Sequence, residues 1–520
     1  RTIADDCSVT DSSAMITLVG LGPGDPGLIT RAAWEMISTA RVLYLRTAVH
    51  PTVAALPPSV VVRAFDDLYE QAECFDEVYE RIADELIARA RGGEAVVYAT
   101  PGDPLTAEAT SRHLLRRARA QGVPARVVPG VSFVEPVCAL LGVDPLEHGL
   151  QLLDALDLMV GDTTVDAPSW ASLHGFTYTP PLLPFPLTPT RPALICQVYS
   201  RSVASHVKLS LLERYPVDHL VTLVRAAGVV DAEAAVELPL HTLDHRNDFD
   251  HLTSLFVPPL TPLADLRGPD GVAYVVARLL GPGGCPWDRE QTPQSLRASL
   301  LEEVHEALEA LDAGNDEALV EELGDVLINV LMLSEMARQA ERFDAGEVFN
   351  AVAGKLIRRH PHVFGDLDVA ASDQVLHNWE AIKRAEHATK GVSRQSALDG
   401  IPPSLPALAA AQKVVSKAAR AGFDAPEIDH AWDALAEELA ELRAVTTDPA
   451  QAEAELGDLL LAVARLGWRL DVDAESALRA AVARFRRRFA RLEMLLNGRD
   501  LRSLSIDEKL ALWERARDDG

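Results

Sequence analysis

The chain is poor in cysteine, and its five cysteines are widely spaced and never form a Cys-x-x-Cys pair. This pattern argues against a disulfide framework or a zinc knuckle, so we expect reduced thiols. No apolar run approaches the roughly 20 residues that a membrane-spanning helix needs. The first fourteen residues lack the apolar core of a signal peptide, and we expect them to form a disordered leader. These features predict a cytoplasmic protein.

Basic residues are also scarce, because 49 Lys and Arg stand against 77 Asp and Glu, which gives a net charge of −28. Sequence-independent binding to nucleic acid or to an anionic membrane needs a surplus of positive charge. The composition therefore argues against a nucleic-acid polymer or a membrane as the partner. Small phosphorylated substrates stay open, since a local basic cluster or a metal ion is enough to hold them.

Acidic residues gather in one stretch of the second half, where three glutamates fall within about one helical turn. A second acidic pair follows at helical spacing and opens an apolar run, residues 326–333, which predicts a buried helix. A carboxylate carried into a core must be protonated, paired or bound to a metal. Carboxylates without accompanying Cys or His suit Mg²⁺ or Mn²⁺, whereas an isolated acidic helix is usually a solvated surface. The predicted ligands are Glu302, Glu303, Glu306, Glu322 and Asp325.

The same arrangement occurs a second time, which indicates an internal duplication. Each acid set is followed by two cations four residues apart and then by a tryptophan four residues before another cation. In the first copy these later residues are Lys355, Arg359, Trp379 and Lys383. In the second copy the acids are Glu437, Glu438, Glu441, Glu455 and Asp458, and the later residues are Arg484, Arg488, Trp513 and Arg517.

The first half alternates predicted strands with helices, which is typical of a mostly parallel sheet. Three of the strands run directly into glycine-containing loops, at the edge where such sheets bind ligands. Glycine lets the backbone approach a ligand closely, although a turn with structural glycines is an equal alternative. The first loop reads Gly-x-Gly-x-Gly, not the dinucleotide spacing. The loop residues are Gly20, Gly22, Gly24, Asp25, Gly102, Asp103, Pro129 and Gly130.

These three loops, in this order, resemble the tetrapyrrole (corrin/porphyrin) methylase family over residues 15–259. The resemblance implies a two-lobed α/β domain that binds S-adenosylmethionine between its lobes, with the loop residues named above as cofactor contacts. One departure is that Leu105 and Thr106 follow the second loop's Gly-Asp-Pro, where active members usually place Tyr-Gly. A methyltransferase and a regulatory domain therefore both stay open.

The second half resembles the MazG-type nucleoside triphosphate pyrophosphohydrolases. The likeness rests on Cys285-Pro286-Trp287-Asp288, the first acid set and residues 355–364. It spans 263–400, after a proline-rich boundary, and a looser copy spans 403–520, so that the whole looks like a YabN-type fusion. The resemblance implies two all-α units, a homodimer or an internal pseudo-dimer, and Mg²⁺-dependent conversion of nucleoside triphosphates to monophosphates and pyrophosphate, in nucleotide-pool house-cleaning.

That reaction gives the residues distinct roles. Metal ions lower the pKa of a bound water, and a carboxylate not fully occupied by metal, for which we take Glu303, accepts the water's proton. The cations predicted to hold the phosphates are Lys355, Arg358, Arg359 and Lys383. Stacking on the base is predicted for Trp287 and Trp379, with core packing as the alternative, and nucleotide contacts in the second copy for Arg484, Arg488, Trp513 and Arg517.

We expect the first copy to be the working site, because it keeps both lysines and the Cys-Pro-Trp-Asp loop that the second copy lacks. One alternative makes the chain chiefly an S-adenosylmethionine-dependent methyltransferase whose helical units serve oligomerisation or regulation. Another makes one helical copy a non-catalytic partner of the other.

Overall fold

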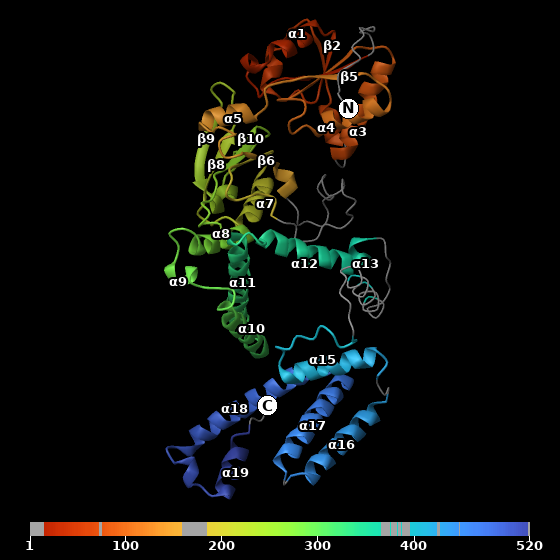
Figure 1. Ribbon diagram of the computed structural model, residues 1–520. Coiled ribbons are helices and arrows are strands. Elements are labelled where there is room, and N and C mark those ends of the chain that lie inside the picture. The colour runs from red at the N-terminus through yellow and green to blue at the C-terminus, as the bar shows by residue number, and fades with distance from the viewer. Residues whose placement is uncertain are drawn as a thin grey trace. The chain divides into compact units, whose positions relative to one another are not determined.

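The computed structural model describes residues 15–71, 75–158, 185–365, 396–423, 427–446 and 448–517, with the single positions 375, 382 and 386. The predicted leader, Trp379 and Lys383 lie outside these residues. The chain divides into two compact units, Arg1–Arg289 and Glu290–Gly520. The first is built on sheets and the second is helical, as predicted (Figure 1).

The first unit opens with a wholly parallel sheet in the order β3-β2-β4-β1-β5. Its strands are β1 (Ile16–Gly20), β2 (Val42–Leu45), β3 (Val61–Ala64), β4 (Val96–Thr100) and β5 (Ala125–Val128). Because β1 lies between β4 and β5, with Ile16 opposite both Val96 and Ala125, the three glycine loops leave the same edge side by side.

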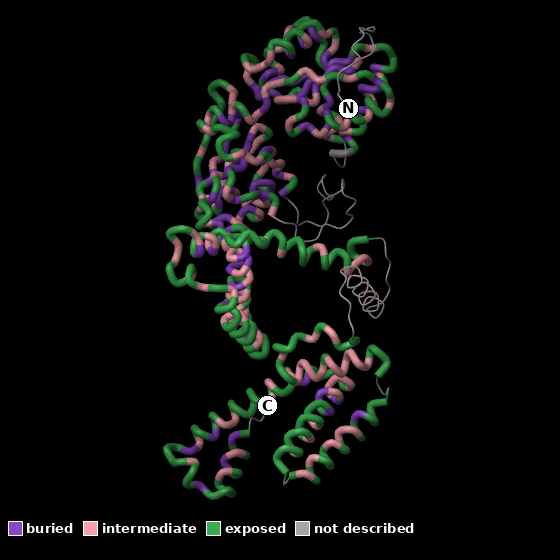
Figure 2. The backbone as a smooth tube through the Cα atoms, viewed as in Figure 1, coloured by how far each residue is buried: buried purple, intermediate pink, exposed green. Residues whose placement is uncertain are grey.

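Helices and apolar side chains surround this sheet. The helices are η1 (Pro26–Leu28), α1 (Arg31–Thr39), η2 (Pro51–Ala55), α2 (Asp66–Gln71), α3 (Phe75–Arg91) and α4 (Ala109–Ala120). The next helix, α5 (Val134–Leu141), packs against the second sheet instead, since Val137 shares a core cluster with Leu194 and Val224. Thr30 caps α1, since its hydroxyl accepts the Ala33 N–H at 3.2 Å. Leu18, Tyr44 and Tyr98 are fully or almost fully buried, and Figure 2 shows buried positions concentrated in this unit.

The second sheet has the order β6-β7-β10-β8-β9, and only its β6–β7 pair is parallel. Its strands are β6 (Gln151–Asp154), β7 (Ala193–Cys196), β8 (Leu220–Arg225), β9 (Ala234–Pro239) and β10 (Thr253–Val257). The helices of this part are η3 (Ala155–Leu158), α7 (Arg201–Leu212), η4 (Leu240–His245), α8 (Pro269–Leu280) and α9 (Pro286–Arg289). A separate core that includes Ile195, Val207 and Leu255 holds this lobe together.

The second unit contains two acidic helical hairpins. Its helices are α10 (Leu296–Ala313), α11 (Asp316–Gln339), α12 (Ala345–Arg359), α13 (Pro361–Phe364), α15 (Ala407–Arg420), α16 (Ile428–Ala444), α17 (Pro449–Arg469), α18 (Ala474–Leu496), η5 (Leu501–Ser503) and α19 (Ile506–Arg515). Gly314, at φ 63°, turns the chain between α10 and α11, and Asn315 caps α11. Within the described part of the chain, no helix is long and apolar enough to cross a bilayer.

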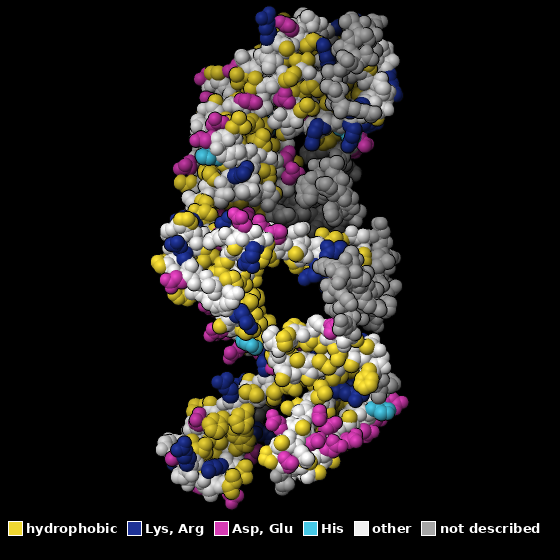
Figure 3. Space-filling model, viewed as in Figure 1, with side chains coloured by type: hydrophobic (Ala, Val, Ile, Leu, Met, Phe, Trp, Pro, Cys, Tyr) yellow, Lys and Arg dark blue, Asp and Glu magenta, His cyan; other side chains and the backbone are white. Residues whose placement is uncertain are grey.

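The apolar run that opens with Val326 was predicted to be buried, and this prediction is wrong in part. Leu331 and Met332 are buried, but Leu327 and Ile328 are 44% and 39% exposed. The reason is that α11 packs on one side against α10, which leaves the other apolar side uncovered within one chain. Figure 3 shows hydrophobic side chains at the surface of the helical unit. Leu460, in the matching run of the second hairpin, is 47% exposed.

The glycines of the first unit's loops serve close contact between backbones. A Cβ on Gly20 would lie 2.5 Å from both the Gly102 carbonyl oxygen and the Gly130 Cα. We expect Gly20→Ala to lower the free energy of unfolding of this unit by about 1–3 kcal/mol, as overpacking does. Gly27→Ala is the control, with an expected change within about 0.5 kcal/mol, because only the movable Asp25 side chain lies near its Cβ. Urea unfolding measures both, and equal stabilities would contradict the prediction.

Candidate functional site

Three of the predicted acids in the first hairpin converge. Glu303 comes from α10, and Glu322 and Asp325 come from the neighbouring helix α11, on which three-residue spacing places them on one side. One carboxylate oxygen from each residue lies within 4.8 Å of those of the other two, and all three side chains are half-buried. Such a group of oxygen ligands can hold a hard divalent cation.

The other two predicted ligands stand differently. Glu302 and Glu306 are exposed and lie outside this group. Glu306 is nonetheless close enough to Glu322 to repel it. Desolvation raises the pKa of the Glu322 carboxyl, and repulsion from Glu306, Glu321 and Asp325 raises it further. Mutual repulsion of this kind is relieved when a cation binds, so the charge pattern favours a metal site.

A buried polar chain that the sequence reading missed supports Glu303. Ser299 donates to Glu303 Oε1 at 3.3 Å, and Asn329 Nδ2 donates to Ser299 Oγ at 3.2 Å and to the Asp325 carbonyl at 3.0 Å. Asn329 is only 4% exposed. The available signal was an Asn one helical turn after Asp325, inside an otherwise apolar run. Outer residues of this kind orient metal ligands.

We expect Asn329→Ala to weaken metal affinity or activity by roughly 10–100-fold, the usual effect of losing a residue that orients a ligand. The matched control is Ser334→Ala, also buried on α11, whose hydroxyl donates to the Val330 carbonyl of its own helix. The turnover rate of each variant is measured as a function of Mg²⁺ concentration. Recovery of Asn329→Ala at high Mg²⁺ would confirm a positioning role, whereas an unchanged titration would contradict it.

The second hairpin repeats the acid group but not its support. Glu438 on α16 and Glu455 and Asp458 on α17 bring one oxygen each within 4.8 Å of the others. Glu437 and Glu441 are exposed and lie outside this group, and acidic side chains gather over α16 in Figure 3. The positions that match Ser299 and Asn329 are Ala434 and Ala462. The first copy is therefore the better supported one.

Two predicted phosphate-binding residues of the first copy, Arg358 and Arg359, are engaged by an acid outside the predicted metal group. Among the described residues, Arg358 and Arg359 both pair with Glu386, at 3.2 and 2.7 Å, and Lys355 on α12 is exposed without an ion pair. Trp287 lies on α9 of the first unit and is 68% exposed.

In the second copy, Trp513 packs with the small core of α18 and α19. Arg488 stacks its guanidinium 4.1 Å from the centre of that ring and donates to the Trp513 carbonyl at 2.9 Å. Glu514 pairs with Arg488 and Arg517, while Arg484 is exposed. These contacts favour a structural role for Trp513 and Arg488.

The glycine loops of the first unit are joined to one another by hydrogen bonds. Gly22 and Gly102 exchange backbone hydrogen bonds, and the Asp103 carboxylate accepts the N–H groups of Leu105 and Gly130 at 2.8 and 3.1 Å. Elsewhere, Asp25 caps η1 and the Pro129 carbonyl accepts the Thr30 hydroxyl. Of the eight predicted cofactor contacts, only Gly102 and Asp103 line the neighbouring cavity. The six that do not are Gly20, Gly22, Gly24, Asp25, Pro129 and Gly130.

This cavity has a volume of about 510 Å³ and takes its walls from the loops of both sheets. The sequence reading missed its charged residues. Arg46, directly after β2, pairs with Glu108 before α4, and its Nε donates to the Tyr69 hydroxyl at 3.1 Å. Glu108 is only 2% exposed. His50 also lines the cavity and is 5% exposed, and burial lowers the pKa of its imidazole to about 4.

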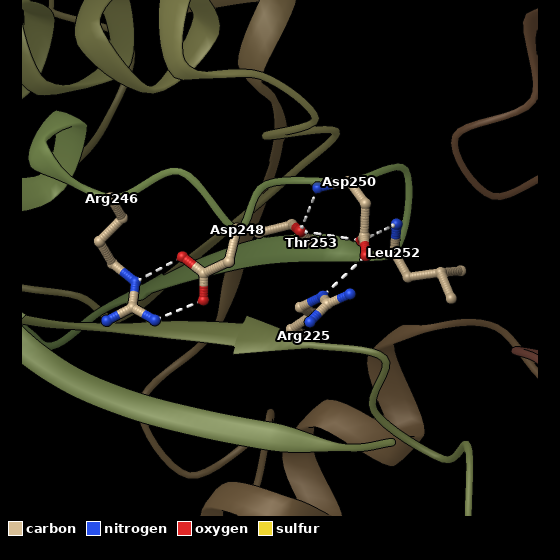
Figure 4. A network of polar contacts seen from close by, with 6 residues as sticks. All are labelled: Arg225, Arg246, Asp248, Asp250, Leu252 and Thr253. Carbon is tan, nitrogen blue, oxygen red and sulfur yellow. Dashed lines mark hydrogen bonds and ion pairs between the residues drawn. The ribbon is translucent and has the colours of Figure 1, made fainter.

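A fixed loop before β10 supplies a further wall of the cavity. Arg225 pairs with Asp250 at 2.7 Å, and the other Asp250 oxygen accepts the Leu252 N–H at 2.9 Å and the Thr253 hydroxyl at 3.1 Å. Although desolvation opposes them, these bonds lower the pKa of the Asp250 carboxyl. The loop therefore stays charged and fixed at neutral pH, with His251 against the cavity. Figure 4 draws Arg225, Arg246, Asp248, Asp250, Leu252 and Thr253.

Comparisons with known proteins agree with this division. Residues 15–244 match the family model of the Tetrapyrrole (Corrin/Porphyrin) Methylases, and residues 291–364 match that of the MazG nucleotide pyrophosphohydrolase domain. YabN of Bacillus subtilis (strain 168) is 36% identical over 97% of this chain and 98% of its own length. The nucleoside triphosphate pyrophosphohydrolase/pyrophosphatase MazG of Thermotoga maritima is 40% identical over 47% of this chain and 93% of its own length. The nucleoside triphosphate pyrophosphohydrolase of Escherichia coli (strain K12) is 40% identical over 46% and 92%.

An α/β unit with a cavity between two lobes, followed by helices with paired acid groups, defines a tetrapyrrole methylase domain fused to a MazG-type helical region. The chain belongs to the family of such fusions that includes YabN of Bacillus subtilis.

Proposed function

We propose that the first helical hairpin is a Mg²⁺-dependent nucleoside triphosphate pyrophosphohydrolase. The observation that carries this proposal is the convergence of Glu303, Glu322 and Asp325 within 4.8 Å. The names of the Thermotoga maritima and Escherichia coli relatives add support, since they are nucleoside triphosphate pyrophosphohydrolases.

The three carboxylates fit a divalent cation, which when bound neutralises phosphate charge and lowers the pKa of a coordinated water. Glu322 and Asp325 would hold that ion from α11. Glu303, fixed by Ser299, is the carboxylate placed to accept a proton from the attacking water. The exposed Glu302 and Glu306 would complete the ligand set once the charge is neutralised.

The triphosphate also needs cations that hold its leaving group. Lys355 is the open candidate, while Arg358 and Arg359 would exchange Glu386 for phosphate oxygens, which are equally suited to a guanidinium. Lys383 lies outside the described residues, and its role in holding phosphate stays a prediction. For stacking on the base, the exposed Trp287 and the predicted Trp379 remain the candidates. Stacking tolerates every base, which suits house-cleaning of the nucleotide pool.

Product analysis tests this function. The full chain is incubated with Mg²⁺ and several nucleoside triphosphates, and products are separated by ion exchange. The expected products are the monophosphate and pyrophosphate, formed only with the metal present. Orthophosphate as the first product, or turnover that persists in excess chelator, would overturn the proposal.

The uncovered apolar sides of α11 and α17 support a homodimer or an internal pseudo-dimer of the helical units. Exposed apolar surface of this kind is typical of an interface. Light scattering on the full chain distinguishes the two, because only the homodimer doubles the mass.

A second candidate function is methyl transfer from S-adenosylmethionine in the first unit. The observation that favours it is the 510 Å³ cavity at the carboxyl ends of β1 and β4, a size in the range of small-molecule sites. Calorimetry with S-adenosylmethionine tests it, and absence of binding at near-millimolar ligand would remove it.

A further inference from the structure

Several residues that line the cavity of the first unit have the strained backbone conformations typical of ligand sites. Three of its lining residues that are not glycine, Ala107, Gln197 and Ala226, adopt positive φ angles of 55°, 61° and 51°. Gln197 and Ala226 directly follow β7 and β8, and Ala107 lies in the loop between β4 and α4. Such conformations cost free energy, persist only where the surroundings impose them, and cluster at ligand sites.

The charge of the described lining residues is negative. Asp66, Asp103 and Glu108 are the acidic members, and Arg46 is the one Lys or Arg among them. The Arg46 guanidinium is engaged, since Nη1 contacts Glu108 and Nε donates to Tyr69. A polycarboxylate ligand would therefore bring several negative charges to a cavity in which the one Lys or Arg among the described lining residues is already paired, and Coulomb repulsion disfavours this.

Two of the three carboxylates are already satisfied by the protein. Asp66 accepts from the Thr47 hydroxyl and the Ala48 N–H, and Asp103 accepts from three groups of its own and neighbouring loops. Glu108 differs, because its Oε2 is buried without a hydrogen-bond partner among the described residues. A buried acceptor without a donor is rare in native proteins, and a ligand in the cavity can supply the donor.

His50 is the second residue with unmet hydrogen bonding. Both of its ring nitrogens are buried without a partner among the described residues. Its imidazole is neutral at pH 7 because burial lowers its pKa to about 4. A neutral imidazole has one lone pair and one N–H to offer a ligand. His251, which also lines the cavity, adds to this lowering of the His50 pKa.

We propose that the cavity lined by Glu108 and His50 receives a small molecule that bears an amino group, and not a polycarboxylate tetrapyrrole. The inference rests on the second candidate function, in which this amine is the methyl acceptor. The bound ammonium first loses one proton to solvent, and its neutral nitrogen then attacks the methyl carbon of the sulfonium. The new C–N bond forms as the C–S bond breaks, and the electron pair of the C–S bond stays on sulfur. The positive charge thereby moves from sulfur to nitrogen, where Glu108 stabilises it.

Two probes that share a phenylethyl skeleton and carry head groups of opposite charge test the proposal on the full chain. They are 2-phenylethylamine and 3-phenylpropionate, whose shared phenyl group suits the Phe133, Val137 and Leu252 side of the cavity. Saturation-transfer NMR is expected to detect the amine and not the acid. In Glu108→Gln the freed Arg46 should reverse this order, with the amine at least tenfold weaker. Glu85→Gln is the matched control, because Glu85 pairs with Arg89 at 2.7 Å outside the cavity and its loss should change neither signal.

If Glu108→Gln does not fold, the wild-type comparison decides alone. The proposal would be overturned by equal signals from the two probes or by no signal from either. It would also be overturned if uroporphyrin bound and S-adenosylmethionine displaced it. Calorimetry with S-adenosylmethionine separates the two ideas. Amine binding that depends on Glu108 without S-adenosylmethionine binding would sustain the ligand class and remove the methyltransferase function. If S-adenosylmethionine bound and the cavity preferred the acid probe, the methyltransferase function would be sustained and the amine would be removed as the ligand class.

Discussion

Asp325→Ala is expected to reduce pyrophosphate release from nucleoside triphosphates by about 10³-fold. Asp325 contributes one of three oxygens that meet within 4.8 Å, and its loss leaves Glu303 and Glu322 as an incomplete set. A bound metal ion stabilises the transition state by several kcal/mol, and each ~1.4 kcal/mol lost is a tenfold lower rate. Steady-state turnover with saturating Mg²⁺ measures the effect, and circular dichroism checks that α10 and α11 remain helical.

Asp458→Ala is the matched control, since it removes the same carboxylate from the second hairpin. We expect it to leave most of the turnover, because the polar support from Ser299 and Asn329 has no counterpart at Ala434 and Ala462. If Asp458→Ala alone abolished turnover, the second hairpin would be the working site. If both changes were needed, the two hairpins would share the reaction.

Local patterns of the sequence were sufficient for most elements of the fold. The strand Ala125–Val128 and the cap at Thr30 follow directly from short apolar runs and from a hydroxyl before a helix. The parallel direction of the strands in the first sheet follows from the alternation of strands and helices. The exposure of Leu327 does not follow from the sequence. Apolar residues on all sides of a helix do not indicate how many neighbouring helices of the same chain cover it.

The sites show a similar limit. Helical spacing identifies the acids of α10, but only the face that α10 turns toward α11 decides that Glu303 and not Glu302 reaches Glu322. The pair of Arg46 and Glu108 joins residues 62 apart in sequence. It exists because β2 lies beside β4 in the register that puts Leu45 opposite Ala99. Such long-range pairing is invisible to a reading based on motifs.

Arg46→Met is expected to destabilise the first unit by about 3–5 kcal/mol, the usual result when one partner of a buried ion pair is removed. The Glu108 carboxylate, only 2% exposed, would lose the guanidinium that compensates its burial. Arg46→Met with Glu108→Leu is the control, and it should regain most of this stability because an apolar pair carries no buried charge. Urea unfolding measures both variants, and a double variant no more stable than the single one would contradict the electrostatic explanation.

The loss in Arg46→Met should also depend on pH, with a sign set by Glu108. In the wild-type protein burial already raises the pKa of this carboxyl, and Arg46 opposes that shift. Without Arg46 the folded pKa rises further above the unfolded value of about 4.3, so the folded state binds more protons between the two values. Stability of the variant must then fall as pH rises through this window. Urea midpoints at about pH 5 and pH 8 test this sign, and a variant more stable at the higher pH than at the lower would show that Glu108 is not the source of the loss.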